Sequence, residues 1–549
     1  MSQSTSLSSF KPVWRLDVWR ALTLAAVALP ILPLLALVWI ALAPAPAQAP
    51  IWGHLWASVL PGQIVTTALL MAGVATVTGV IGTGSAWAVA FYRFPLRRTL
   101  SWALLLPLAI PTYLMAYSYA EVLDHAGPLY QIWHSLLPET AYPDFRSLPG
   151  AIILLSLVLY PYVYLSARAA FVQQSAVLIE AGRALGLGPL QCFTRIGLPM
   201  ARPAIIVGVA LAMMECLNDI GAVEFLGVTT LTMGVYDTWV VRGNLAGAAQ
   251  IALTLLGFMA LLLVLERSQR GHAEHHIRNG RHRSLPDFQT SRAARLALCL
   301  ACLLPVTLGF IIPTGLLIDY ALIGATADGV LASAGRSFSL AMLAAGLTCL
   351  LGLGLTYAAR SGRTPKQRRE IQRLGQIAAL GYAVPGTVLA IGVMLVFARL
   401  ADASLGWITL GGTSVALVFA YVVRFLSLSY GTLEAGFGRI SPGLDMAARG
   451  LGATKSALLW RVHLPLLRAP LLTAAILVFV DVMKELPATL ILRPFDFETL
   501  ATHVYTYASV GQMEDAALPA LMIILVGLIP VAISLSLLEQ IRKGRRKAA

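Results

Sequence analysis

Two apolar stretches of the sequence each run into ionisable side chains. Glu215 is followed four residues later by Asp219, and Asp481 is followed by Lys484 and Glu485. Residues four apart on a helix share a face, so each stretch is predicted to present two carboxylates on one stripe. Ionisable groups at membrane depth are costly and usually face a water-filled path or one another. The pattern predicts a translocation path lined by these five residues.

A plainer alternative is that Lys484 only neutralises Asp481 or Glu485 inside a helix bundle. The two interpretations are compatible if the charged pair lines the boundary between two halves of the protein.

These stretches occupy equivalent places in an internal repeat. Residues 180–199 align without a gap with residues 446–465, at an offset of 266 residues, and the same offset relates the carboxylates of the two stretches. Self-similarity at one fixed spacing is typical of a duplicated structural unit. Seven residues are identical in the two segments: Ala181, Arg183, Leu185, Gly186, Arg195, Leu198 and Pro199, which recur as Ala447, Arg449, Leu451, Gly452, Arg461, Leu464 and Pro465.

Each repeated segment is predicted to hold two short helices. Good helix formers run up to Gly186 or Gly452, where glycine ends the helix, and a second amphipathic turn runs to Leu-Pro, where proline disfavours continuation. An apolar face on the water side of a membrane needs a partner groove. The alternative is a surface helix that packs back on its own protein. The apolar side chains of this face are Leu190, Phe193 and Ile196 in the first copy, and Leu458, Leu459 and Val462 in the second.

Composition places the chain in a lipid bilayer. Hydrophobic residues make up 58% and charged residues only 12%, against about 25% charged in typical soluble domains. Two short apolar stretches, 203–214 and 469–480, follow the repeated segments. Ten further segments of at least 21 residues contain no Asp, Glu, Lys or Arg: 21–43, 63–92, 99–120, 147–167, 245–265, 296–318, 337–359, 374–398, 403–423 and 516–538. Each can cross a hydrocarbon core of about 30 Å. The fold class expected is an all-α integral membrane protein with twelve transmembrane helices in two homologous six-helix halves.

The first apolar run is longer than the core of a signal peptide and more spans follow, so we expect it to be retained as a helix. The expected domain layout is an N-terminal cytoplasmic segment, first helix and external loop (1–61), a first repeated domain (62–266), a basic cytoplasmic linker (267–295), a seventh helix and external loop (296–335), a second repeated domain (336–538) and a basic tail (539–549).

The basic residues alternate between loops. With the N-terminus inside, the loops predicted to be cytoplasmic hold most of the Lys and Arg, including six in 360–373 and five in 542–547. This is the positive-inside pattern. It predicts a multi-pass protein of the bacterial cytoplasmic membrane with both termini in the cytoplasm. The net charge of +14 then requires no nucleic-acid partner.

The repeated segment resembles the cytoplasmic signature loop of type I ABC importer permeases, with Glu-Ala, a glycine and Ile-x-Leu-Pro at the family spacing. The resemblance implies that each loop docks into a groove on a separate ATPase subunit, expected as a homodimer. The second copy departs from the pattern, because Met446 stands where the first copy has Glu180, with Asp445 one residue earlier. The docking residues implied are Glu180, Ala181, Gly182, Gly186, Ile196, Leu198 and Pro199, then Asp445, Ala447, Ala448, Gly452, Val462, Leu464 and Pro465.

Two further stretches, 107–130 and 484–505, resemble the fused permeases of iron(III) importers, which carry both six-helix halves on one chain. The resemblance implies ferric iron as cargo and an extracytoplasmic solute-binding protein as partner. Fused permeases for thiamine, phosphonates or other small solutes share this architecture and remain alternatives. Carboxylates along the path, with phenols at Tyr113, Tyr117 and Tyr119, suit hard Fe(III). Conduction requires weak binding, so we expect transient contacts and no stoichiometric metal site.

Two other function classes, an ion-coupled secondary transporter and a membrane enzyme, fit the sequence less well. An ion-coupled secondary transporter also uses internal repeats and buried carboxylates, but it does not call for a repeated cytoplasmic loop with an apolar docking face. A membrane enzyme would need a nucleophile and base or a set of metal ligands, and the sequence shows neither. Residues 450–456 end in Lys-Ser like a phosphate-binding loop but lack the glycine before the lysine and a preceding strand. We therefore expect no catalytic site, no cofactor and no nucleotide site on this chain.

Overall fold

The computed structural model describes residues 18–42, 51–125, 127–173, 176–273, 288, 290–324, 329–362, 364–406 and 409–548. All the named elements within these ranges are helices, as expected of a chain that must satisfy its backbone hydrogen bonds within each segment in lipid. In the part of the chain that the structure describes, eleven helices are long and apolar enough to cross a membrane, and a pair of helices bent by 90° makes a twelfth span if it counts as one. The predicted all-α membrane fold is confirmed.

The elements follow one another in two similar series. The first series is α1 (Val18–Leu42), α2 (Ile51–His54), η1 (Leu55–Val59), α3 (Leu60–Phe91), α4 (Arg97–Ala103), η2 (Leu106–Ala109), α5 (Thr112–Ser118), α6 (Ala120–Leu123), α7 (Pro128–Leu136), α8 (Leu148–Gln173), α9 (Ala176–Ala184), α10 (Pro189–Cys192), η3 (Phe193–Gly197), α11 (Leu198–Asn218), α12 (Gly221–Phe225), α13 (Leu231–Tyr236), η4 (Asp237–Val241) and α14 (Leu245–Ala273). The second is α15 (Arg292–Val306), η6 (Thr307–Ile311), α16 (Ile312–Gly324), α17 (Val330–Ser361), α18 (Pro365–Ala378), η7 (Ala379–Ala383), α19 (Gly386–Ala403), α20 (Ser414–Gly438), α21 (Pro442–Gly450), α22 (Lys455–Leu458), η8 (Leu459–His463), α23 (Leu464–Met483), α24 (Pro487–Leu492), α25 (Leu500–Ser509) and α26 (Met513–Ala548).

Three predicted spans differ from the structure. The segment 99–120 is not one straight helix but the bent pair that breaks before α5, at Pro111. The segment 374–398 breaks in the same way, because α18 and η7 end before Pro385 and α19 starts after it. Proline removes a backbone donor and disfavours helix in the residue before it. The segment 403–423 starts too early, since a turn with positive φ at Leu405 precedes α20.

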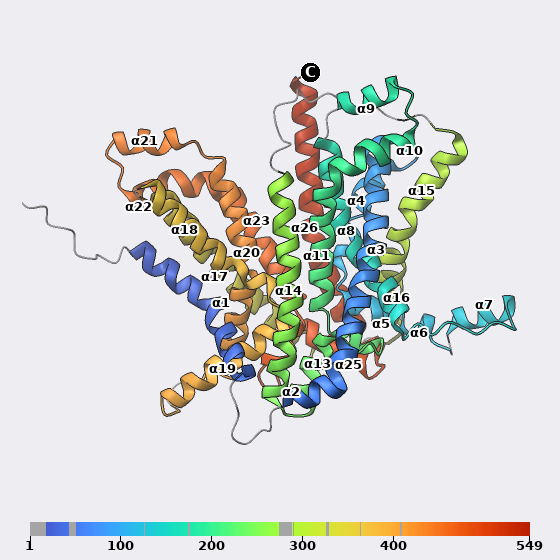
Figure 1. The fold of residues 1–549 in the computed structure, drawn as a ribbon, viewed down its shortest axis with the longest axis horizontal. Helices are drawn as coiled ribbons and strands as arrows, with labels where there is room; N and C mark the ends of the chain where they lie inside the picture. Colours follow the sequence, from blue (N-terminus) through green and yellow to red (C-terminus); the bar gives the residue numbers. More distant parts are fainter. Residues whose placement is uncertain are drawn as a thin grey trace, which may run out of the picture.

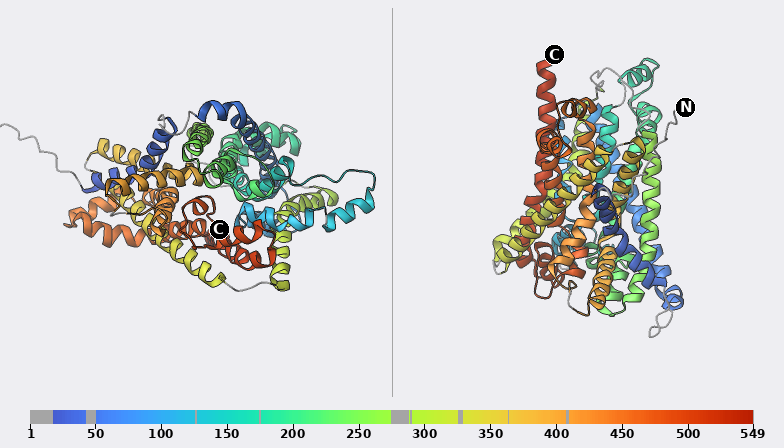
Figure 2. Two further views of the ribbon diagram at one scale, coloured as in Figure 1. Left: turned by 90° about the horizontal axis from the view of Figure 1, so that it is seen from below. Right: turned by 90° about the vertical axis from the view of Figure 1, so that its left-hand side faces the viewer.

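The two halves match in detailed contacts as well as in element order. The hydroxyl of Thr67 on α3 accepts a hydrogen bond from the backbone N–H of Leu231, and Ser337 on α17 accepts one from Leu500. In each half, this contact joins the first part of a long helix, α3 or α17, to the start of a short helix, α13 or α25. Figure 2 (left) shows the blue-to-green elements of the first half beside the orange elements of the second.

The first long helix of each half packs on the opposite half. Helix α1 contacts α17, α18 and α19 as well as α14, while α15 and α16 contact α3, α4 and α5 together with α26. At one close approach, a Cβ on Gly392 of α19 would lie 2.5 Å from the backbone oxygen of Pro33 on α1. The halves of the sequence are therefore interlocked in space.

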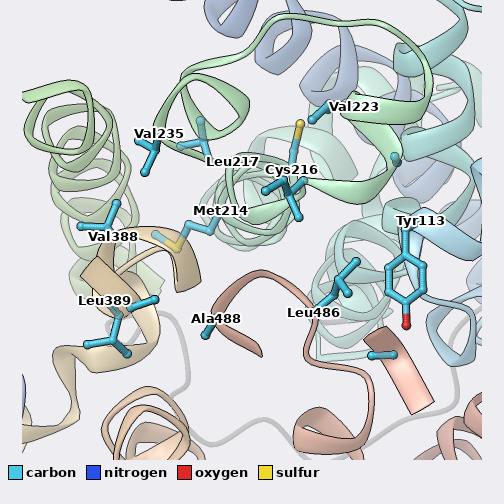
Figure 3. Close-up of a cluster of buried hydrophobic side chains, with 14 of the residues drawn as sticks. Tyr113, Met214, Cys216, Leu217, Val223, Val235, Val388, Leu389, Leu486 and Ala488 are labelled. Atoms are coloured by element: carbon cyan, nitrogen blue, oxygen red, sulfur yellow. The ribbon is translucent and has the colours of Figure 1, made fainter. Parts of the chain in front are cut away.

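The main apolar core crosses the boundary between the two halves, which we call the seam. Tyr113, Cys216 and Leu217 of the first half belong to the same buried cluster as Leu389 and Leu486 of the second. Figure 3 shows these side chains in one cluster. The core thus closes around the place where the ionisable residues of both halves meet.

Candidate functional site: a charged cavity at the seam and two repeat loops

A cavity of about 90 Å³ lies at the seam, several times the space that one water needs. All five predicted path residues, Glu215, Asp219, Asp481, Lys484 and Glu485, line it. The structure therefore brings together residues that are up to 270 positions apart in the sequence. Further lining residues come from both halves, among them Thr112, Tyr113, Tyr162, Asn218, Tyr382 and Arg424.

Two of the carboxylates cap short helices. Asp219 accepts hydrogen bonds from the backbone N–H groups of Ala222 (2.9 Å) and Val223 (3.1 Å) at the start of α12, and the Thr112 hydroxyl donates to its other oxygen. In the second half, Glu485 accepts from the backbone N–H of Ala488 (3.2 Å) in α24. A side-chain oxygen at a helix start satisfies N–H groups that have no partner within the helix. Both residues thus cap the short helices, α12 and α24, that follow α11 and α23.

The predicted common helix face is wrong in its geometry. Helix α11 ends at Asn218 and α23 ends at Met483, so Asp219 and Glu485 lie beyond the helices that carry Glu215 and Asp481. Irregular backbone at membrane depth is tolerated where it is buried in protein or lines a cavity. The break turns all four carboxylates toward one cavity from two different segments in each half.

Arg424 is the central cation of the site. Its guanidinium lies 3.3 Å from the carboxylate of Glu485 and donates to the side-chain oxygen of Asn218 at 3.0 Å. The same Asn218 oxygen accepts from the backbone N–H of Gly386 at 2.8 Å. Because Asn218 belongs to the first half and the other three residues belong to the second, this network is a polar bridge across the seam.

A second polar contact crosses the seam beside the first, since the Tyr382 hydroxyl donates to the carboxylate of Glu215. Lys484 pairs with Asp481 at 2.9 Å, three residues away. The predicted neutralisation of Lys484 thus involves Asp481, while Glu485 has Arg424 as its partner. With four carboxylates and two bases on its wall, the cavity carries a formal charge of −2.

Sequence reasoning missed Arg424, Tyr382 and Tyr162. The charge-free segment that predicted this span ends at residue 423, one position before Arg424, although the apolar sequence continues for another turn. A single Arg inside such a run was the signal that could have found it. Of the three tyrosines predicted near the outer end of the third span, Tyr113 lines the cavity. Tyr117 packs against Phe225, and the Tyr119 hydroxyl donates to the backbone oxygen of Leu308.

The repeated segments form two loops at one end of the molecule, which we call the first repeat loop (176–199) and the second repeat loop (442–465). Figure 1 shows α9 and α21 at the same end as the C-terminus of α26, opposite α2, α13 and α25. Gly186 and Gly452 adopt φ values of 81° and 82°, two residues beyond the end of the first helix of each loop. This left-handed conformation suits glycine and is the usual way in which a helix ends.

The predicted apolar face of these loops is turned inward only in part. Leu458 is buried, and Phe193 and Ile196 pack against a buried aromatic cluster, whereas Leu190 is 72% exposed. The most exposed apolar side chains are instead Leu185 and Leu451, at equivalent positions, with 83% and 90% of their surface accessible. Among the predicted docking residues, Ala181, Gly186, Pro199, Ala447, Gly452 and Pro465 are exposed, Glu180, Ile196, Leu198, Ala448, Val462 and Leu464 are intermediate, and Gly182 and Asp445 are buried.

Asp445 is held by residues of its own chain. Its carboxylate lies 2.8 Å from Nε of Arg360 and 2.9 Å from Nε2 of His463. Burial acts to raise the pKa of the Asp445 carboxyl, but the hydrogen bonds and charges of Arg360 and His463 outweigh it, so the pKa lies below its usual value. Asp445 therefore does not offer a carboxylate on the surface of the loop.

Comparison with known proteins gives two domain matches and several relatives. The family model described as "Binding-protein-dependent transport system inner membrane component" matches residues 79–270 and again residues 351–547. The Fe(3+)-transport system permease protein FbpB 2 of Haemophilus influenzae is 26% identical over 480 residues, covering 85% of this chain and 88% of the relative. Each of the two domain matches contains one repeat loop, and the match to FbpB 2 spans both loops.

Two other relatives show the range of named cargoes. The ferric transport system permease protein FbpB of Actinobacillus pleuropneumoniae is 22% identical over 478 residues, covering 82% of this chain and 67% of the relative. The sulfate transport system permease protein CysT of Salmonella typhimurium is 30% identical over 179 residues, covering 32% of this chain and 63% of the relative. Since the family model matches both halves of the chain, this protein belongs to the family of binding-protein-dependent transport system inner membrane components, as a fused ABC importer permease.

Proposed function

We propose that this permease carries ferric iron, free or as a small chelate, across the bacterial cytoplasmic membrane through the seam between its halves. The observation that carries the proposal is the cavity, whose wall holds Glu215, Asp219, Asp481 and Glu485 against only two basic side chains. Hard cations prefer oxygen ligands. A formal charge of −2 favours a cation over an oxyanion in a site shielded from water.

The helix ends at the cavity support the same choice. The start of a helix is a natural anion site because its N–H groups point outward. Here the N–H groups of α12 and α24 are already taken by Asp219 and Glu485. An oxyanion such as sulfate or phosphonate would have to displace these carboxylates, whereas a cation would gain oxygen ligands from them.

The share of this chain that each relative matches supports iron as the cargo. The two relatives named as iron permeases match more than four fifths of this chain, while the relative named as a sulfate permease matches a third of it. Identities of 22–30% leave other cargoes open to test. Sulfate, thiamine and phosphonate are the competing cargoes, and Arg424 with Lys484 would have to serve as their counter-ions.

We further propose that the two repeat loops dock on a pair of identical ATPase subunits, which supply the energy, and that a solute-binding protein delivers the cargo from outside. With both repeat loops in the cytoplasm, both termini lie there as well. We propose the domain limits that the sequence predicts. The positive-inside pattern and the position of both loops at one end of the molecule support this arrangement.

Deletion of the gene, followed by uptake measurements with radioactive ferric iron under iron starvation, tests the cargo. We expect iron uptake to fall and to return with the wild-type gene, while sulfate, thiamine and phosphonate uptake stay unchanged. Unchanged iron uptake with loss of one of the other three would overturn the iron assignment.

A charge variant links the cargo to the cavity. Asp481→Asn should lower ferric uptake at least about tenfold, because it leaves Lys484 as an uncompensated positive charge in the path of a cation. Asp402→Asn, an exposed carboxylate at the end of α19, is the matched control. Equal uptake by the two variants would speak against the cavity as the path.

A further inference from the structure

The second repeat loop is closed on itself by a buried ionic group. Asp445 lies in α21, at the start of the loop, and His463 ends η8, just before α23. Their contact of 2.9 Å therefore joins the two ends of the loop. Arg360, near the end of α17, binds the other oxygen of Asp445 and also donates to the backbone oxygens of Phe437 and Ile440. One arginine thus ties the loop to the ends of two long helices.

This group, which we call the ionic mount, is largely shielded from water, since the side chains of Arg360 and Asp445 keep only 17% and 12% of their surface accessible. His463 has no accessible surface, and its ring packs edge-on against Tyr357 and Phe437, with centroids 5.7 and 5.3 Å away. The Tyr357 hydroxyl donates to the backbone oxygen of Lys455 inside the loop, at 2.6 Å. Breaking a buried ion pair by removing one partner is strongly destabilising, because it leaves a charge without compensation.

The first repeat loop has no ionisable residue at the two positions equivalent to Asp445 and His463. The offset of 266 residues puts Gly197 at the position of His463 and Ile179 at the position of Asp445. Trp87 fills the space in front of Gly197, where a Cβ would lie 2.5 Å from its ring. Trp87 packs in turn against Phe171 and Phe193, with ring centroids 5.3 and 5.1 Å away. Ile179 is fully buried in the same cluster. We call this group the aromatic mount.

The surfaces that the two mounts support also differ. Both loops expose a leucine before the glycine, Leu185 or Leu451. The second loop adds exposed Met446 and Trp460, where the first loop has Glu180 and Thr194, while the first loop adds exposed Leu190, where the second has Ser456. The exposed apolar side chains of the two loops therefore differ in kind and in position.

We infer that Asp445 is a positioning residue which, through Arg360 and His463, holds the second repeat loop in the shape that an ATPase subunit recognises, while the first repeat loop has Ile179 and Gly197 at the equivalent positions. This inference rests on the proposed docking function of the loops. It makes the two docking contacts of one chain chemically unequal, so that a single charge change releases one and spares the other.

Hydrogen exchange of the full-length permease in detergent tests the mount itself. In Asp445→Asn, we expect the amides of residues 442–463 to exchange at least about tenfold faster than in the wild type, and those of residues 176–197 to change less than about twofold. Asp402→Asn, at the opposite end of the same half, should change neither loop. Equal exchange of the second loop in Asp445→Asn and the wild type would overturn the inference.

A double variant separates the ionic mount from general damage. Arg360→Met with Asp445→Met removes both charges of this pair at once and should restore part of the protection that Asp445→Asn loses, because paired removal leaves neither of these two charges uncompensated. A double variant as unprotected as the sum of its two single changes would argue against a coupled pair.

Photo-crosslinking then tests the consequence for docking. Leu185 or Leu451 is replaced by benzoylphenylalanine in the permease co-expressed with its ATP-binding subunit. We expect cross-links from both positions in otherwise wild-type protein, and loss of at least about tenfold at position 451 alone when Asp445→Asn is added. Full cross-linking at 451 in that variant would overturn the positioning role. If neither position cross-links in otherwise wild-type protein, the docking function fails, while hydrogen exchange still decides the ionic mount.

Discussion

Arg424 shows how much of this site depends on one residue. It is buried beside Glu485 and holds Asn218 of the other half, and no residue of the first half repeats it, since the offset of 266 residues places Val158 there. A duplicated chain would be expected to have two equivalent walls. The single arginine makes the cavity asymmetric and joins the two halves at the cavity.

Replacement of Arg424 with Met should therefore destabilise the permease by about 3–5 kcal/mol, because Glu485 is left as an unpaired buried charge. Thermal unfolding of the purified protein measures the change. Arg399→Met, on the exposed side of α19, is the matched control and should stay within about 0.5 kcal/mol. Addition of Glu485→Gln to the Arg424 variant should recover part of the loss, and a further full loss would contradict the pairing.

Asp445 predicts a dependence on pH that belongs to the second loop only. Burial acts to raise the pKa of its carboxyl, but the hydrogen bonds and charges of Arg360 and His463 outweigh burial and lower the pKa overall. A lowered pKa in the folded state means that ionised Asp445 stabilises the fold above the usual carboxyl pKa of about 3.9. This contribution is lost as the pH falls through the lower, folded value.

We therefore expect the second loop to lose protection from hydrogen exchange, relative to the first loop, only below about pH 4. Exchange of the two loops in one sample, compared at pH 7, 5, 4 and 3, measures the effect and uses the first loop as internal reference. In Asp445→Asn this difference between pH 7 and pH 3 should vanish. A loss that begins near pH 6 would point to another group.

At the scale of elements, each repeat loop is a short helix, a glycine turn and a second short helix. The N–H of Leu187 bonds to the oxygen of Gly182 in the first loop, and Ala453 bonds to Ala448 in the second, each at 3.0 Å. These bonds close the end of a helix around a left-handed glycine. The exposed Leu185 and Leu451 stand directly before that turn, so the turn decides where they point.

Valine at Gly186 or Gly452 should uncouple ATP hydrolysis from uptake, because a β-branched residue is strained by at least about 1–2 kcal/mol at positive φ. The ratio of ATP hydrolysed to cargo moved in proteoliposomes measures coupling, and membrane insertion should be normal. Gly188→Ala and Gly450→Ala are the matched controls, since neither has positive φ and an added Cβ meets nothing within 4 Å. Full coupling in both valine variants would refute the role of the turns.

At the scale of the whole molecule, the interlocked halves explain why one chain is useful. Helix α1 lies against α17, α18 and α19 of the second half, and α16 lies against α26 and α5. If the two halves were separate chains, each would have to bury its first helix against a partner. Fusion keeps both halves at a high effective concentration, and it fixes the pairing that forms the polar bridge at the seam.

The topology is open to a direct test. Reporter fusions after Gly271, at the end of α14, and after Arg542, near the end of α26, should both report the cytoplasm, because basic residues are concentrated in the loops that adjoin them. A fusion after Asp402, at the end of α19, should report the outside and serves as the control for the opposite sign. An external signal at Gly271 or Arg542 would contradict the proposed orientation.

The sequence by itself determined the elements and the repeat. Charge-free length sets the spans, because lipid excludes unpaired charges and backbone groups. One gapless offset revealed the duplication, because both loops keep glycine where a helix must end. The sequence also singled out five of the six charged residues that line the cavity, since charge beside an apolar run is rare and costly.

Only the tertiary structure decided how these parts meet. Pro111 and Pro385 divide two predicted spans, and how the chain continues after each depends on packing and not on composition. The pairing of Arg424 with Glu485, and of Lys484 with Asp481, is a choice among several partners at similar sequence distance. Asp445 turns inward because Arg360 and His463, far away in sequence, reach it there. Local pattern cannot specify such contacts, because they depend on which helices become neighbours once the two halves interlock.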